Sequence, residues 1–289
     1  MAQGFGLSLD VIKIDGGLST ALEAQGADLK SILWTGELIE KNPDAIVAAH
    51  KAFISSGAQI IITSSYQVSF IGQEKTGKSD QEISDLLKTS TKLARIASEG
   101  SSAKVAASIG PYGAALGDGS EYRGNYEISE SSLRDFHLKR IELLAETNPD
   151  LFAIETIPSL TEAKLIEEIV IQTDIPYWIS FSCKDESNIS EGDSLNDAIS
   201  ELSNGENQIA VGINCTDPKF VTPLLNSVSV KEEFVLYPNA GRVWDADAKV
   251  WIGDLTGFNQ YVSEWIALGA QFIGGCCGVG PAQIAELSI

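Results

Sequence analysis

Short apolar runs recur along the whole chain, each five to seven residues long. Within a run the residues are nearly all apolar and do not alternate with polar ones. Unbroken runs of this length are typical of parallel strands that are buried on both faces. The runs lie at 11–15, 59–65, 104–110, 151–156, 177–183, 209–215, 233–239 and 271–277. We therefore expect eight buried strands.

Segments with helical spacing of apolar residues separate these runs. In one of them Asn42 is suited to cap a helix that begins at Pro43, and Gly57 is suited to end it. The expected buried face of that helix carries Ile46, Ala49 and Phe53. Further helices are expected over 80–100, over 131–147, after Pro158 and, in a short form, at 194–203. The segment 131–147 places Leu133, Phe136, Arg140, Leu143 and Leu144 at helical spacing.

Eight strands that alternate with helices predict a (β/α)8 barrel. No linker or low-complexity segment divides the sequence, so we expect one domain over residues 1–289. The fold alternative is an open doubly wound sheet. That fold normally has a glycine-rich phosphate turn after its first strand, and the sequence GGLST at 16–20 is a poor match to it.

Composition and charge narrow the classes of partner. The 289 residues are 44% hydrophobic, and the net charge is −20. Such a surface repels nucleic acid and anionic membranes, although the charge also fits a merely solvated exterior. We find no run long enough to span a membrane and no signal peptide. Four cysteines do not make a disulfide framework, so we expect a cytoplasmic protein with free thiols.

Three of the cysteines follow predicted strands. Cys215 ends the sixth apolar run, and Cys276 and Cys277 end the eighth after two glycines. In a barrel the active site lies at the carboxyl ends of the strands, so these thiols should share one mouth. Three sulfur ligands suit a catalytic zinc that keeps a position open. The alternatives are a vicinal disulfide within the pair and, for Cys183, a role as a small buried hydrophobe.

The two histidines, His50 and His137, fall inside predicted helices and away from the strand ends. We expect packing or surface roles for both. No histidine is then placed to act as a general base, so we expect no catalytic residue beyond the zinc site, and the metal must activate a nucleophile.

Sequence motifs over nearly the whole chain resemble those of the homocysteine S-methyltransferase family, and most closely the branch that uses S-methylmethionine or S-adenosylmethionine. The motifs are specific in combination, whereas each alone is weak. They are DGGLSTALEAQG at 15–26, LWTGELIEKNP at 33–43, TSSYQ at 63–67, SIGPYGAALGDGSEYRGNY at 108–126, ETIPSLTEAK at 155–164, GINCTDP at 212–218, YPNAGRVWD at 237–245 and GGCCGVGP at 274–281.

The resemblance implies a barrel whose zinc is bound by Cys215, Cys276 and Cys277, with the homocysteine sulfur in the open position. It also implies that Asp15 and Glu155 hold the substrate's ammonium group. Asn214 is expected with them among the substrate-binding residues. The alternative for the two carboxylates is a hydrogen-bonding role in loop structure.

The methyl donor implied by the resemblance is a sulfonium cation, which aromatic faces attract. Trp34 and Tyr66 match family positions near the donor, and packing alone is the alternative for Trp34. Glu121 and Arg123 are expected to pair with the donor's own ammonium and carboxylate, or else with each other. The implied partners are small molecules.

The sequence departs from the family pattern near the mouth. The motif YPNSGE becomes YPNAGR, with Ala240 and Arg242, and Arg-Thr-Thr-Pro after the cysteine pair becomes Gly278-Val279-Gly280-Pro281. These changes bear on the identity of the methyl donor more than on that of the acceptor. Betaine or another donor, a cobalamin protein as methyl source, and a barrel that binds zinc or thiols without turnover remain as alternatives.

Overall fold

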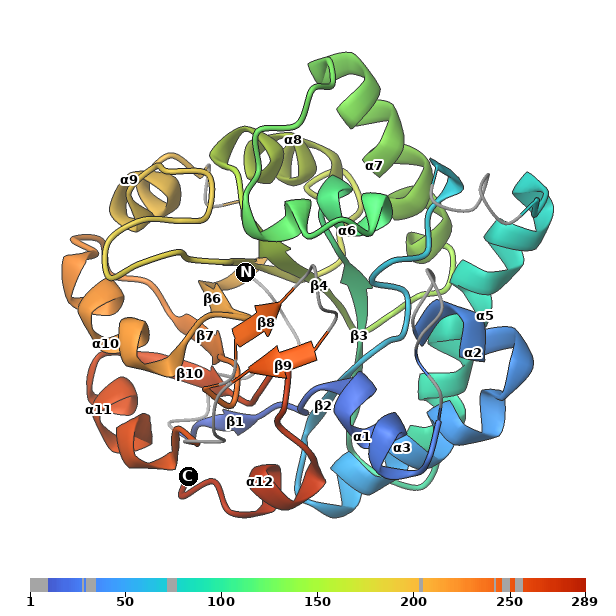
Figure 1. The fold of residues 1–289 in the computed structure, drawn as a ribbon, viewed down its shortest axis with the longest axis horizontal. Coiled ribbons are helices and arrows are strands. Elements are labelled where there is room, and N and C mark those ends of the chain that lie inside the picture. The colour runs from blue at the N-terminus through green and yellow to red at the C-terminus, as the bar shows by residue number, and fades with distance from the viewer. Residues whose placement is uncertain are drawn as a thin grey trace.

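The computed structural model describes residues 10–27, 29, 35–71, 77–202, 205–241, 243–245, 250–252 and 257–289. Its centre is a ring of parallel strands with helices around it (Figure 1). The strands of the ring are β1 (Ile12–Lys13), β2 (Ile60–Ile62), β3 (Lys104–Ile109), β4 (Leu151–Ile157), β5 (Tyr177–Phe181), β6 (Gln208–Asn214), β7 (Phe234–Tyr237) and β10 (Ala270–Ile273).

The strands pair in the order β1-β10-β7-β6-β5-β4-β3-β2. A parallel bridge between Ile14 and Ile60 joins the two edge strands and closes the ring. The predicted (β/α)8 barrel is therefore confirmed, and each of the eight apolar runs overlaps one of its strands. The open doubly wound sheet is wrong.

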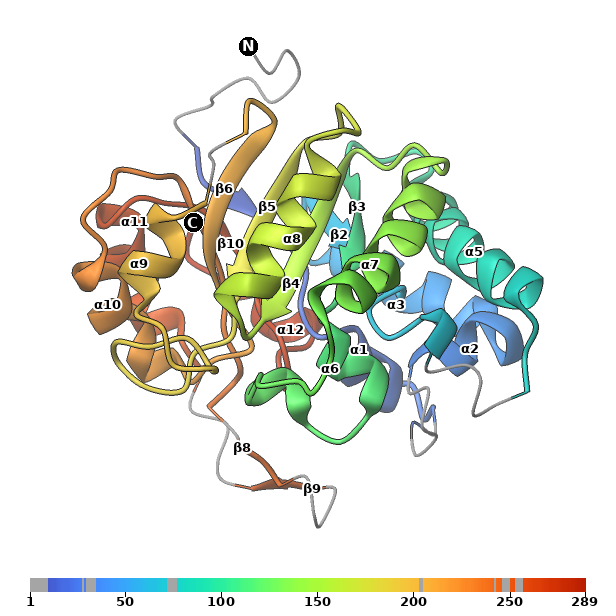
Figure 2. The same ribbon diagram turned by 90° about the horizontal axis from the view of Figure 1, so that it is seen from above.

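Helices cover the outside of the ring (Figures 1 and 2). The helices are α1 (Leu18–Ala24), α2 (Thr35–Lys41), α3 (Pro43–Ser55), α5 (Asp80–Ser98), α6 (Tyr112–Leu116), α7 (Glu130–Ala145), α8 (Leu160–Val170), α9 (Leu195–Ser200), α10 (Pro218–Ser227), α11 (Val262–Ala267) and α12 (Pro281–Ala285). The described residues also contain the 3-10 turns η1 (Ser120–Tyr122) and η2 (Asn259–Tyr261).

Helix α3 forms as its sequence predicts. The Asn42 side chain accepts a hydrogen bond from the Ala45 N–H at 3.3 Å, and Pro43 occupies the first turn. Its three expected apolar residues are buried, and the chain leaves the helix through Gly57 at φ +94°. Helix α9 is as short as expected.

Apolar side chains form two layers. A smaller cluster, which includes Ile14, Trp178 and Phe272, comes from the ring strands. A larger cluster joins the strands to the surrounding helices. Because both faces of the strands are covered, the strands carry few polar residues until they reach their carboxyl ends.

The carboxyl ends of the strands form the face of the barrel from which the longer connections rise. A hairpin of β8 (Val243–Asp245) and β9 (Val250–Ile252) stands out from the ring on the side to which β4 points (Figure 2). Within the described residues, no helix is long and apolar enough to cross a membrane.

Candidate active site

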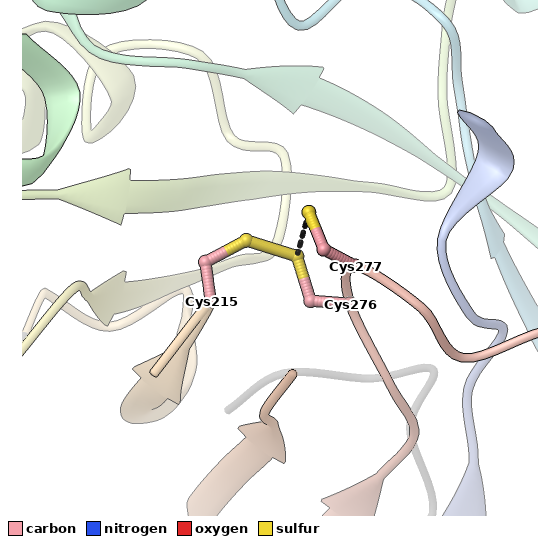
Figure 3. Close-up of side chains that lie close together, drawn as sticks. All are labelled: Cys215, Cys276 and Cys277. Carbon is pink, nitrogen blue, oxygen red and sulfur yellow. Dashed lines mark hydrogen bonds between the residues drawn. A yellow bond between two sulfur atoms is a disulfide. The ribbon is translucent and has the colours of Figure 1, made fainter. Parts of the chain in front are cut away.

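Three cysteine sulfurs meet at the carboxyl ends of strands β6 and β10. Cys215 follows β6, and Cys276 and Cys277 follow β10 after two glycines. Their sulfur atoms all lie within 4.8 Å of one another, and Cys215 and Cys277 are buried (Figure 3). Only β7 separates the two strands in the ring, which explains how residues so far apart in sequence converge. The donor set of three sulfurs fits a soft metal ion.

Two of these sulfurs are bonded to each other, because Cys215 and Cys276 form a disulfide (Figure 3). The expectation of free thiols is therefore wrong for these two residues in this structure. The strand ends hold the two Cα atoms 5.4 Å apart, which is within the ordinary range for a disulfide. The vicinal alternative is also wrong, since the Cys276 and Cys277 sulfurs lie 4.0 Å apart.

Glycines make room for the cysteine pair. A Cβ on Gly274 would lie 2.3 Å from Ile14 Cγ1 and 2.4 Å from the Asp15 carbonyl oxygen. A Cβ on Gly275 would lie 2.2 Å from Val279 Cγ1. The lack of a side chain lets Gly274 lie against Ile14 and Asp15, and lets Gly275 lie against Val279.

The segment in which the sequence departs from the family pattern is itself tightly held. Gly278 adopts φ +80°, and its N–H donates to Thr20 Oγ1 at 3.0 Å. Val279 is fully buried, and its carbonyl accepts a hydrogen bond from the Gly17 N–H at 2.9 Å. Ala240 is also buried, and its N–H donates to the Cys277 carbonyl at 2.9 Å. Arg242 lies outside the described residues.

Asp15 and Glu155 lie at the carboxyl ends of β1 and β4 and are both buried. Asp15 Oδ2 accepts a hydrogen bond from the Ile62 N–H at 2.8 Å, and Glu155 accepts one from the Ser108 hydroxyl. Burial and the charge of Glu155 raise the pKa of Asp15 well above its usual range. Burial also raises the pKa of Glu155, to about 7. Two buried carboxylates of this kind are chemically suited to a cationic group.

Asn214 is fully buried, and its amide group bonds to protein partners. Its Oδ1 accepts hydrogen bonds from the Thr156 N–H at 2.6 Å and from the Ser180 hydroxyl at 3.0 Å. Its Nδ2 donates to Thr156 Oγ1 at 2.7 Å. Contact between Asn214 and a substrate stays a prediction, and these bonds favour an indirect role at the strand ends.

Of the residues expected near a donor, Tyr66 lies on the loop after β2, and Glu121 and Arg123 lie on the loop after β3. The hydroxyl of Tyr66 bonds to the Thr156 side chain. Burial raises the pKa of Tyr66 well above its usual range, and the charges of Glu121 and Glu155 raise it further. Glu121 is half-buried in η1, and its Oε2 atom has no hydrogen-bond partner within the described residues. Burial raises the pKa of Glu121 to about 7.

Arg123 and Trp34 add less to this group. The guanidinium of Arg123 is exposed and lies 3.9 Å from the carboxylate of Asp118. Arg123 and Glu121, the alternative pair, are not in direct contact in the structure. Arg123 also donates to Ser120 Oγ at 3.4 Å. Trp34 lies outside the described residues.

Both histidines lie in helices outside the ring, as expected. His50 in α3 is buried, and neither ring nitrogen has a hydrogen-bond partner within the described residues. His137 in α7 is buried too, and its Nε2 lies 2.8 Å from Glu162 Oε1 in α8. Desolvation lowers the pKa of both histidines, for His50 to about 4.

Sequence reasoning missed three polar residues that hold the site. These residues are Ser108, Thr156 and Tyr237, which come from β3, β4 and β7. Tyr237 receives a hydrogen bond from Trp178 Nε1 at 3.1 Å, and its hydroxyl also bonds to Glu155. A polar residue inside an apolar run was the available signal, as at Ser108 in KVAASIG.

Comparisons with known proteins find relatives over nearly the whole chain. The homocysteine S-methyltransferase family model matches residues 12–289. Homocysteine S-methyltransferase 1 of Brassica oleracea var. italica is 40% identical, over 95% of this chain and 91% of its own. The metallated homocysteine methyltransferase MmuM of Escherichia coli superposes with a TM-score of 0.85 at 35% identity, over 96% of this chain and 95% of that chain.

An oxidised form of the same Escherichia coli enzyme superposes almost as well. Its TM-score is 0.84 at 34% identity, over 96% of this chain and 94% of that chain. The family model spans the strand ends that carry the three cysteines and the two buried carboxylates. The chain belongs to the homocysteine S-methyltransferase family.

Proposed function

We propose that the chain binds one Zn²⁺ through Cys215, Cys276 and Cys277 and transfers a methyl group from a sulfonium donor to homocysteine. The observation that carries the proposal is the convergence of three cysteine sulfurs within 4.8 Å at the barrel mouth. Zinc favours tetrahedral sites, and three sulfurs leave its fourth position for a substrate. A zinc ion bound there supplies a thiolate form of homocysteine at neutral pH.

Metal binding requires the reduced protein. In the disulfide form two of the three sulfurs are bonded to each other, so reduction by two electrons must yield the Cys215 and Cys276 thiols first. The metallated and oxidised forms of the Escherichia coli enzyme show that a relative exists in both kinds of state. We place the protein in a reducing cytoplasm for this reason.

The two buried carboxylates give the acceptor its orientation. We assign the α-ammonium group of homocysteine to Asp15 and Glu155, because both are buried and the charge of Glu155 disfavours the ionised form of Asp15. An ammonium group between them relieves this repulsion and holds both in the ionised form. Asn214, Ser108 and Tyr237 keep the strand ends that carry these acids in place.

The donor binds on the side of β2 and β3. We assign the cationic sulfonium to the ring of Tyr66 and the donor's ammonium group to Glu121. The unpartnered Oε2 of Glu121 supports this assignment, because a buried carboxylate oxygen requires a partner. S-methylmethionine and S-adenosylmethionine both carry these two groups, and Arg123 and Trp34 remain candidates for the rest of either molecule.

The reaction is an in-line displacement at the methyl carbon. The homocysteine sulfur forms a bond to that carbon, the bond to the sulfonium sulfur breaks, and its electron pair stays on a neutral thioether. The acceptor thiol releases its proton to solvent. The protein contributes mainly by holding both substrates in line, with the carboxylates on one side and Tyr66 and Glu121 on the other.

An assay of the reduced, zinc-loaded protein tests the proposal. We expect methionine from homocysteine with S-methylmethionine or S-adenosylmethionine, and less with betaine. Tight binding of zinc and homocysteine without product from any of the three donors would indicate the non-catalytic barrel. Product that appears only with a separate methyl-cobalamin protein would indicate that other methyl source.

A further inference from the structure

Helix α7 carries a buried charge on the outside of the ring of strands. The side chain of Arg140 is 1% exposed, and its guanidinium lies over the ring of Phe136 at 4.8 Å. Burial of a guanidinium is unfavourable unless its N–H groups are satisfied. Desolvation lowers the pKa of Arg140 to about 10, so the group stays charged at neutral pH.

The guanidinium donates three hydrogen bonds to backbone carbonyl oxygens at the barrel mouth. Nε donates to Val68 at 3.0 Å, Nη1 to Gly110 at 3.1 Å and Nη2 to Tyr66 at 3.1 Å. These acceptors lie on the loops that follow β2 and β3. One planar group therefore fixes the relative positions of both loops, and a lysine ammonium lacks the planar shape to do so.

A second buried group extends this attachment. Glu162 in α8 is fully buried, and its Oε1 accepts a hydrogen bond from the Tyr112 N–H at 2.6 Å. Tyr112 begins α6, and α6 lies directly against η1, where a Cβ on Gly113 would lie 2.5 Å from the Glu121 nitrogen. The loop that carries Glu121 is thus held by α7, through Gly110, and by α8, through Tyr112.

Other hydrogen bonds hold the residues on the acceptor side of the site. Asp15 is held by the Ile62 N–H, and Thr156, next to Glu155, is held by Asn214. The N–H of Cys276 donates to the Pro238 carbonyl at 2.8 Å. None of these contacts involves the Arg140 guanidinium. The two sides do meet, because the Tyr66 hydroxyl bonds to the Thr156 side chain and Tyr122 bonds to Cys277. The hydrogen bonds of the Arg140 guanidinium go to the donor-side loops.

We propose that Arg140 is a positioning residue for the methyl donor, because its guanidinium sets the loop carbonyls of Tyr66, Val68 and Gly110 relative to each other. This inference rests on the proposed assignment of Tyr66 and Glu121 to the donor. Removal of the guanidinium frees the two loops and leaves the cysteines and the buried carboxylates in place.

Steady-state kinetics of Arg140→Lys and Arg140→Met test the inference. We expect the KM for the donor to rise about 10- to 100-fold in Arg140→Met, with the KM for homocysteine within about twofold of wild type. The donor KM of Arg140→Lys should lie between those of wild type and Arg140→Met. The matched control is Arg134→Met on the same helix, where the arginine forms an exposed ion pair with Glu168 at 2.7 Å.

Hydrogen–deuterium exchange provides a readout that needs no turnover. In Arg140→Met we expect faster exchange in peptides that cover 63–71 and 110–124, and unchanged exchange in 208–216 and 270–280. Equal changes in both KM values, or unchanged exchange in the loop peptides, would overturn the inference. Failure of wild-type turnover alone would count against the proposed function, and the exchange result would still decide the role of Arg140.

Discussion

Asn214 holds Thr156 by two hydrogen bonds, one to the backbone and one to the side chain. The Thr156 N–H donates to Oδ1 at 2.6 Å, and Nδ2 donates to Thr156 Oγ1 at 2.7 Å. Thr156 adopts φ +61°, and Cys215, the residue after Asn214, adopts φ +47°. Left-handed backbone is unfavourable for such residues and persists where neighbouring contacts require it.

We expect Asn214→Ala to lower the free energy of unfolding by about 2–4 kcal/mol, because buried donors and acceptors on Thr156 and Ser180 lose their partner. Urea denaturation measures this difference. Asn196→Ala is the matched control, since the Asn196 side chain bonds only to exposed backbone and hydroxyl groups of Ser229 and to Asp197. Equal losses of unfolding free energy in the two variants would contradict a stabilising role for the hydrogen bonds of Asn214.

The assignment of the zinc ligands predicts different effects for substitutions at Cys277 and at Cys183. Cys277→Ala should lose zinc and more than about 100-fold of its activity together, because a direct ligand is worth more than an outer contact. Cys183→Ser should keep both, since Cys183 lies at the end of β5, where its backbone N–H donates to Thr216 Oγ1 at 2.9 Å. Metal analysis of the reduced proteins measures the zinc content. Full zinc content in Cys277→Ala would exclude that residue as a ligand.

Glu121 should give donor binding a pH dependence. Its pKa is raised to about 7 by burial, so the carboxylate is ionised above this pH and protonated below it. At saturating homocysteine, kcat/KM for the donor should fall as the pH decreases from 8 to 6. Glu121→Gln should show a raised donor KM at pH 8, by about 10-fold, and should approach wild type at pH 6. Glu127→Gln, at an exposed position on the same loop, should behave as wild type.

A pH profile of Glu121→Gln that parallels wild type would contradict this role, since the carboxylate would then not be the group that titrates. A change confined to the KM for homocysteine would place Glu121 on the acceptor side. Measurement of both KM values at each pH distinguishes these outcomes.

His50 should make the fold sensitive to acid. Burial lowers its pKa in the folded protein to about 4, from 6.5 in the unfolded chain. The unfolded state therefore binds more protons between these values, and stability is lost as the pH falls from 6.5 towards 4. The loss reaches roughly 3 kcal/mol at pH 4. His50→Leu should remove it, so that the free energies of unfolding of the two proteins diverge only below pH 6.5.

Urea denaturation at pH 7.5, 6 and 5 measures this divergence. A difference between wild type and His50→Leu that stays constant over the three values would show that the pKa of His50 is the same in the folded and the unfolded states. His137→Leu is a useful comparison, because the contact of His137 with Glu162 opposes the effect of burial on its pKa.

Much of the barrel could be predicted from the sequence because its strands are buried on both faces. A run such as IAVGINC has no polar residue until Asn214, so the pattern shows both the strand and the end that carries chemistry. The cysteines were predicted for the same reason, since each follows such a run. The disulfide was not predicted, because the direct approach of Cys215 and Cys276 depends on the spacing of strand ends in the closed ring.

The supporting residues could not be predicted, because they act at long range in sequence. Arg140 was expected only to lie at helical spacing, yet it bonds to a carbonyl 74 positions away, at Tyr66. His137 was expected to pack or to lie on the surface, and its contact with Glu162 depends on how α7 and α8 lie together. The contributions of Trp34 and Arg242 stay predictions, as both lie outside the described residues.

The central claim is that three cysteines hold a zinc ion whose fourth position takes the homocysteine sulfur. X-ray absorption at the zinc edge tests it most directly, because sulfur and lighter ligands lie at different distances, about 2.3 Å and 2.0–2.1 Å. We expect three sulfur ligands and one lighter ligand in the reduced, zinc-loaded protein, and four sulfur ligands after homocysteine is added. A sulfur count that stays at three with homocysteine bound would contradict the claim.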